Sequence, residues 1–273
     1  MESLHGRVAV ITGAAGGIGE ALGSVLAASG MKLALADIDA EGLIAARDRL
    51  ADAGAEVIAV PTDVTSEESV IRLKDCTLEH FGSVHVLCNN AGVTVTGAAW
   101  TIPVSAWEKV LSVNLIGVIN GIRTFVPVMK SNCEGHVVNT ASMAGLTSAA
   151  GLAPYSVSKH GVVALSEAIY KELVLEDSGI GVSVVCPGAV TTAMPSSVAA
   201  ATLGDQGPID RAITRAVDES LKGAIAPIRV AEMIRNAILA DQFWVLTHPS
   251  RANSVVRRTR GIVAGINPEP AAF

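Results

Sequence analysis

The chain has few aromatic residues and no paired cysteines. Phe, Trp and Tyr together make up 3% of its 273 residues, whereas glycine occurs 26 times. This composition disfavours an aromatic-rich β-sandwich and favours the close helix–strand packing of the α/β class. The cysteines are Cys76, Cys88, Cys133 and Cys186, none in a Cys-x-x-Cys pair. We therefore expect reduced thiols, with neither a disulfide framework nor a metal site.

Positive charge and long hydrophobic segments are also scarce. The net charge of −6 argues against a nucleic-acid-binding surface. We see no basic-then-apolar leader and no apolar run long enough to cross a bilayer, which predicts a cytoplasmic protein without a membrane span. Half of the residues are hydrophobic, enough for one large core, and we expect residues 1–273 to form a single domain.

Short apolar runs alternate with longer helical patterns. Near-continuous apolar runs are typical of strands buried on both faces of a parallel sheet. The predicted strands are 8–11, 33–36, 57–60, 84–87, 137–139, 182–185 and 243–246, and the predicted helices are 17–29, 40–50, 65–81, 105–129, 155–176 and 230–239. Repeated β-α-β units predict a Rossmann-type, doubly wound parallel sheet of about seven strands with helices on both faces.

Two helix starts carry capping-box spacing, Thr65-x-x-Glu68 and Ser105-x-x-Glu108. A third helix is expected to begin after Asp39, which we interpret as its N-cap.

A glycine-rich turn, containing Gly13, Gly17, Ile18 and Gly19, separates the first strand from the first helix. Glycines at this place let the backbone approach a pyrophosphate at the helix N-terminus. A plain tight turn is the alternative, but the order strand, turn, helix favours a dinucleotide site.

The second predicted strand ends in Asp37 and is followed by Ile38 instead of a basic residue. A carboxylate here can accept hydrogen bonds from both ribose hydroxyls and repels a 2′-phosphate. We therefore expect NAD as the cofactor, with NADP the less favoured alternative.

Two further segments follow the next two strands. Asp63-Val64 can receive an adenine amino group, although Asp63 is equally suited to the N-terminus of the next helix. The run Asn89-Asn90-Ala91-Gly92 can line the adenine side or form a simple turn.

The chemistry is predicted at Tyr155-Ser-Val-Ser-Lys159. A spacing of four places the phenol and the ammonium on one helix face. A nearby cation favours the phenolate, so we expect Lys159 to lower the pKa of Tyr155 toward neutrality, which suits a general acid/base. The alternative is a solvated helix face.

These residues together resemble the short-chain dehydrogenase/reductase family over nearly the whole chain, with a core at 6–192. The matching positions are the glycine turn at 12–19, Asp63, residues 89–92, Asn114, Ser142, Tyr155, Lys159, Pro187, Gly188 and Thr192. The resemblance implies that Tyr155 is the general acid/base and that Lys159 lowers its pKa and holds the nicotinamide ribose. It also implies that Ser142 binds the substrate oxygen and that Asn114 holds a water of a proton relay.

The resemblance implies NAD-dependent interconversion of a secondary alcohol and a ketone. Its expected cofactor contacts are Gly13, Gly17, Ile18, Gly19, Asp37, Asp63, Val64, Asn90, Ala91, Gly92, Tyr155, Lys159, Pro187, Gly188, Val190 and Thr192. The expected substrate contacts are Ser142, Met143, Ala144, Leu152, Tyr155 and Met194. A non-catalytic NAD-binding sensor or scaffold is the alternative function, because fold alone does not establish activity.

Residues 193–226 correspond to the segment that covers the substrate in this family. Small apolar residues and glycines predict a mobile lid over a hydrophobic pocket, and a plain surface helix pair is the alternative. No Lys or Arg lies between Met194 and Asp210, which favours a neutral, fairly hydrophobic alcohol or ketone, such as an aromatic, alicyclic, terpene-like or sterol-like molecule. The extension at 248–273 departs from the commonest family pattern, and we still expect a homodimer or homotetramer.

Overall fold

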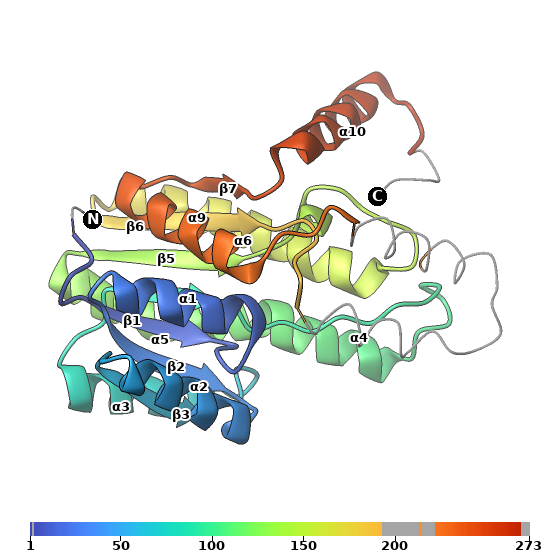
Figure 1. Ribbon diagram of the computed structural model, residues 1–273. Coiled ribbons are helices and arrows are strands. Elements are labelled where there is room, and N and C mark those ends of the chain that lie inside the picture. The colour runs from blue at the N-terminus through green and yellow to red at the C-terminus, as the bar shows by residue number, and fades with distance from the viewer. Residues whose placement is uncertain (2, 193–212, 214–221, 269–273) are drawn as a thin grey trace.

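Seven parallel strands form one sheet in the computed structural model, in the order β3-β2-β1-β4-β5-β6-β7 (Figure 1). The structure describes residues 1, 3–192, 213 and 222–268. The strands are β1 (Val8–Thr12), β2 (Lys32–Asp37), β3 (Val57–Pro61), β4 (Val86–Asn89), β5 (Gly135–Thr140), β6 (Ile180–Cys186) and β7 (Trp244–Leu246). The predicted Rossmann-type doubly wound sheet is confirmed, with β4 two residues later than expected.

Helices lie on both faces of this sheet (Figure 1). They are α1 (Gly17–Ala28), α2 (Ala40–Asp52), α3 (Glu67–Phe81), α4 (Val104–Leu111), α5 (Gly117–Asn132), α6 (Ala153–Leu175), α9 (Pro227–Ala240) and α10 (Ala252–Ala264). A π-helical turn, Ser112–Ile116, joins α4 to α5, and short 3₁₀ turns span Met143–Gly145 and Pro249–Arg251.

Successive strand residues supply two separate cores. Ile11 of β1 packs in a cluster with Leu22 of α1 and Ile234 of α9. Its neighbour Val10 packs on the other side with Phe125 of α5. Each buried side chain of this size contributes roughly 1.5–3 kcal/mol, and burial on both faces explains why the strands are continuously apolar.

The strand order reverses between β1 and β4, because β2 and β3 lie on one side of β1 and β5 to β7 on the other. Ligands of open parallel sheets bind outside the carboxyl ends of the strands at such a reversal. The segments that leave β1, β4, β5 and β6 are therefore the places to look for a site.

The two predicted capping boxes were wrong. Helix α3 begins one residue later than the Thr65 box requires, and the hydroxyl of Ser66 accepts the bond from Ser69 N at 3.2 Å. The Thr65 hydroxyl instead donates to Asp63. Pro103 precedes α4, which has no side-chain cap among the described residues. The Asp39 cap on α2 is confirmed, with a bond from Gly42 N at 3.1 Å.

The predicted helix 105–129 is α4, the π-helical turn and α5 in succession. Together, Val104–Asn132 is long and apolar enough to cross a membrane by length and composition, so the expectation that no run would reach this length was wrong. Here α5 packs against α3, β4 and β5, and its Phe125 and Met129 are fully buried. These contacts explain the apolar sequence as the core side of a helix.

Candidate active site

Lys159 lies almost completely buried on α6, one turn after Tyr155. Its Nζ donates to the carbonyl oxygen of Thr140, at the end of β5, over 2.7 Å. The same Nζ lies 5.7 Å from the centroid of the Tyr155 ring, as the spacing of four requires. Burial lowers the pKa of Lys159 to about 8, and Cys186 acts in the opposite direction. The amine therefore titrates near working pH instead of near 10.

The side chain of Tyr155 lies near the hydroxyl of Ser142. Burial raises the pKa of Tyr155, and the Ser142 side chain opposes that rise. The prediction that Lys159 would lower this pKa was wrong for the structure, because desolvation of the phenolate outweighs other influences. Lys159 also has a competing partner, since its ammonium group is bound to Thr140.

Ser142 is held between the ends of β5 and β6. Its Oγ accepts a hydrogen bond from Ala144 N at 3.1 Å and donates to Pro187 O at 3.4 Å. The next residue, Met143, also donates its backbone N–H to Pro187 O at 2.8 Å. The serine hydroxyl is thereby fixed beside the segment that leaves β6.

Asn114 is fully buried in the π-helical turn. Its Oδ1 accepts from Val93 N at 2.8 Å, while its Nδ2 donates to Val93 O at 2.9 Å and to Ser158 Oγ at 3.0 Å. The Ser158 hydroxyl in turn donates to the backbone oxygen of Tyr155 at 2.7 Å. Such π-bulges often occur at functional sites, and this one links the segment after β4 to the helix that carries Tyr155.

Gly92 separates Asn114 from Lys159. A Cβ placed on this glycine would lie 3.4 Å from Asn114 Oδ1 and 3.6 Å from Lys159 Nζ. Both polar side chains therefore face the same residue after β4. The four predicted catalytic residues, Asn114, Ser142, Tyr155 and Lys159, thus gather at the carboxyl ends of β4, β5 and β6.

The glycine turn after β1 leaves the N-terminus of α1 open to an anion. Gly13 and Gly17 have positive φ values of 68° and 58°, and no side chain of the described residues caps this helix at Gly16. A Cβ on Gly19 would lie 2.0 Å from Gly13 O, so the turn tolerates no side chain there. Ile18 follows in the first turn of the helix. Backbone N–H groups in this arrangement fit a pyrophosphate.

Asp37 joins the end of β2 to the glycine turn. Its Oδ2 accepts from Ala15 N at 2.9 Å, and its Oδ1 accepts from Asp39 N at 3.0 Å. Each carboxylate oxygen retains capacity for a second donor. The position beside the turn fits the ribose of a dinucleotide, and its negative charge disfavours a phosphate.

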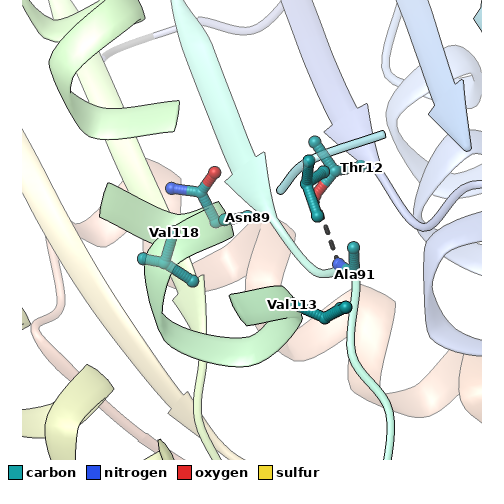
Figure 2. Close-up of a pocket in the computed structure, with 7 residues that line it drawn as sticks. Thr12, Asn89, Ala91, Val113 and Val118 are labelled. Carbon is teal, nitrogen blue, oxygen red and sulfur yellow. Dashed lines mark hydrogen bonds between the residues drawn. The ribbon is translucent and has the colours of Figure 1, made fainter. Parts of the chain in front are cut away.

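Thr12 fastens the end of β1 to the segment after β4. Its hydroxyl accepts from Asn90 N at 3.0 Å. It also accepts from Ala91 N at 3.2 Å, the bond drawn in Figure 2. Asn90 in turn donates a hydrogen bond from Nδ2 to Thr12 O at 3.1 Å. Thr12 and Ala91 line a small pocket. Val113 of the π-helical turn and Val118 of α5 contribute apolar side chains to its lining (Figure 2).

Asp63 acts in the turn before α3 in this structure. Its Oδ1 accepts from both the backbone N and the hydroxyl of Thr65, at 2.9 and 2.7 Å. Val64 is buried, and its carbonyl oxygen accepts from Asn120 Nδ2 at 2.9 Å. The sequence left two roles open for Asp63, a contact with adenine and a place at the N-terminus of the next helix. The observed contacts are those of the second role.

The segment after β6 connects the two halves of the site. Pro187 contacts Ser142 as described above, and Val190 pairs with Ile225. A Cβ on Gly17 would lie 3.2 Å from Thr192 Cγ2, so the segment ends against the glycine turn. We name residues 187–192 the bridging segment.

The predicted substrate contacts are only partly within the described residues. Met143 is buried in a core cluster, whereas Ala144 and Leu152 are partly exposed. Met194 and most of the predicted lid lie outside the described residues, at 193–212 and 214–221.

A family model described as short chain dehydrogenase matches residues 7–202. The chain belongs to the short-chain dehydrogenase/reductase family. A solved family structure from Burkholderia phymatum in complex with NAD covers 100% of both chains, at 38% identity and a TM-score of 0.93. That agreement includes the residues from 248 onward, so the C-terminal extension is shared with this relative.

Two curated relatives are also similar. A putative oxidoreductase SadH of Mycobacterium tuberculosis is 38% identical over 207 residues, which cover 76% of this chain and 75% of the relative. The 1-deoxy-11-beta-hydroxypentalenate dehydrogenase of Streptomyces avermitilis is 34% identical over 248 residues, covering 90% and 86%.

Several polar groups that hold the site together were not predicted from the sequence: the Thr12 hydroxyl, the Thr140 carbonyl, the Ser158 hydroxyl and the His248 ring. Ser158 lies inside the Tyr155-x-x-x-Lys159 motif, so its position one turn from Tyr155 was a usable signal. The other contacts join residues far apart in the chain and have no local pattern.

Proposed function

We propose that the protein is an NAD-dependent oxidoreductase that interconverts a secondary alcohol and a ketone. The observation that carries this proposal is that Ser142 lies near Tyr155 while the ammonium of Lys159 lies over the tyrosine ring. Two neighbouring hydroxyls can bind one substrate oxygen and exchange its proton. The relative named for the dehydrogenation of a hydroxypentalenate supports this reaction class.

The roles follow from what each group can donate. In oxidation, Tyr155 takes the proton of the substrate hydroxyl while Ser142 donates a hydrogen bond to the same oxygen. In reduction, Tyr155 returns the proton and Ser142 stabilises the developing negative charge. A bound nicotinamide cofactor supplies or accepts the hydride. Lys159, whose ammonium lies over the tyrosine ring, would hold the nicotinamide ribose, and Asn114 positions α6 through Ser158.

The residues present fit a dinucleotide. The open N-terminus of α1 suits the pyrophosphate, and Asp37 lies beside the glycine turn where a ribose would be held. The relative solved in complex with NAD, which is matched over 100% of both chains, supports NAD.

Asp37→Asn tests the cofactor preference with almost no change of shape. We expect wild-type kcat/KM to favour NADH over NADPH about 100-fold, because a like charge opposite the 2′-phosphate costs several kcal/mol. The neutral amide should reduce this ratio about tenfold, mainly by improving the use of NADPH. Steady-state kinetics with both cofactors measures the ratios, and Asp39→Asn is the control next to the site. A wild-type preference for NADPH would contradict the proposal.

The substrate is proposed to be neutral and fairly hydrophobic. Support comes from two partly exposed apolar residues, Ala144, whose N–H bonds to Ser142, and Leu152 at the start of α6. A panel of aromatic, alicyclic and terpene-like secondary alcohols with NAD, read by NADH absorbance, tests it. Binding of NADH without turnover of any alcohol or ketone in the panel would favour a non-catalytic sensor.

We further propose a cytoplasmic homodimer or homotetramer. Support comes from Ile116 in the π-helical turn and Val157 on α6, whose apolar side chains are 43% and 51% exposed. Burial of such residues against a second copy would remove apolar surface from water. Analytical ultracentrifugation, together with Val157→Glu as an interface variant, measures the assembly.

A further inference from the structure

The first residue of the C-terminal extension reaches back to the site. His248 follows β7 and is about nine-tenths buried, with a side chain 9% exposed. Its Nδ1 lies 3.2 Å from Gly188 N in the bridging segment. These residues are 60 positions apart in the chain.

The hydrogen bonds define which nitrogen accepts. Gly188 N–H points at both His248 Nδ1 and Thr247 Oγ1, over 3.2 and 3.3 Å, and the two side-chain atoms lie 2.7 Å apart. A backbone N–H can only donate, so Nδ1 is an acceptor and the proton of the neutral ring is on Nε2. Burial lowers the pKa of His248, while the backbone oxygens of Gly223 and Ala189 act in the opposite direction. The neutral form that this hydrogen bond requires is therefore favoured.

The ring also packs directly beneath the backbone of Gly188. A Cβ there would lie 2.7 Å from His248 Nδ1, closer than nonbonded atoms approach. The close packing of the His248 ring and its hydrogen bond from Gly188 N together fix the position of Gly188, the second residue of the bridging segment. Because this segment touches Ser142 at one end and Gly17 at the other, its position determines how the catalytic and pyrophosphate ends of the site are spaced.

We propose that His248 is a positioning residue that holds the bridging segment against the nicotinamide half of the bound cofactor. The inference rests on the proposed function, since it assumes that the cofactor lies between the glycine turn and Ser142. His248 acts through Gly188 and contributes nothing to proton transfer. The extension thus supplies a structural support for cofactor binding through its first residue.

Three substitutions separate the hydrogen bond from mere space filling. Asn can place an amide oxygen near the position of Nδ1, Leu has a similar shape without an acceptor, and Gln carries its amide one carbon further out. We expect His248→Leu and His248→Gln to weaken NADH binding about tenfold, the scale of one lost buried hydrogen bond. His248→Asn should remain within about threefold of wild type, by the same scale.

Binding of NADH and of ADP-ribose, each measured by titration calorimetry, forms the test. ADP-ribose lacks the nicotinamide, so its affinity should be equal in wild type and all three variants if His248 acts at that half. The Leu and Gln variants should also raise KM for NAD more than they lower kcat. Unchanged ADP-ribose affinity reports that a variant is folded.

Two results would overturn the inference: NADH affinity unaffected in both the Leu and Gln variants, or an equal loss of NADH and ADP-ribose affinity. Either leaves the proposed function intact, provided that wild type binds NADH and oxidises alcohols. A wild-type protein that binds no nicotinamide cofactor would instead overturn the proposed function and the inference with it.

Discussion

Tyr155→Phe should lower kcat for alcohol oxidation by at least about 10³-fold, the upper part of the range for loss of a general acid/base. The substitution removes one oxygen and leaves the ring beneath Lys159, so the pocket should keep its shape. NADH affinity should stay within about threefold of wild type, because the ring, Ser142 and the glycine turn are retained. Stopped-flow absorbance measures the hydride step, and fluorescence titration measures the binding.

Tyr170→Phe is the matched control. Tyr170 is the second of two tyrosines in the chain, and it lies on α6 with a side chain 37% exposed. The residue four positions later is Val174 instead of a lysine. This variant should retain the activity of wild type. Near-wild-type activity of Tyr155→Phe would show that the proton is exchanged by another group.

Acid should destabilise the fold through His136. This residue of β5 is 1% exposed, and its Nε2 lies 2.8 Å from Ser183 Oγ. The Ser183 hydroxyl donates to Gln242 O at 2.7 Å, so its oxygen accepts a hydrogen bond from Nε2–H of a neutral ring. Burial lowers the pKa of His136 to about 3. Asp241 lies 3.7 Å from Nδ1 but its side chain is 63% exposed, so it offsets little of the cost of charging the ring.

The direction of the effect follows from the two protonation states. Between pH 6.5 and 3 the unfolded chain binds a proton at His136 that the folded chain does not. The free energy of unfolding therefore increases with pH in this window and decreases as pH falls through it. The full difference is about 5 kcal/mol, from roughly 1.4 kcal/mol per pKa unit.

His136→Gln isolates this contribution. Glutamine can donate to Ser183 from its amide but does not titrate, so the variant should lose less stability than wild type between pH 7 and pH 4. Urea unfolding at the two pH values measures the difference, and His5→Gln, at an exposed position, is the control substitution. Parallel pH dependence in wild type and His136→Gln would show that His136 is already charged or solvated in the fold.

The sequence predicted the sheet well because the inner strands are buried on both faces. A residue such as Val10 or Ile11 must be apolar whichever core it enters, and the resulting runs are readable without knowledge of the partners. Element boundaries were less predictable. Ser66 caps α3 because Thr65 is engaged by Asp63, and this competition depends on geometry that a four-residue spacing does not contain.

The site shows a similar division. The four predicted catalytic residues come together because each follows or lies near the carboxyl end of a strand, and the parallel sheet aligns those ends. The pKa of Tyr155 was predicted in the wrong direction because sequence spacing reports the cation but not the desolvation around the phenol. His248 was missed as a supporting residue because only the folded chain places it beneath Gly188.

The π-helical turn at Ser112–Ile116 makes chain length, in addition to residue identity, a requirement of the site. An α-helix turns by about 100° and rises about 1.5 Å per residue. Removing one residue from this turn would replace its wider hydrogen-bonding pattern with that of a regular α-helix, and the residues of the turn would be redirected relative to α4 and α5 by up to about that angle. Asn114 would then point away from Val93 and Ser158 even though its side chain is unchanged. Single-residue insertions and deletions should therefore be tolerated less well at residues 112–116 than most point substitutions there.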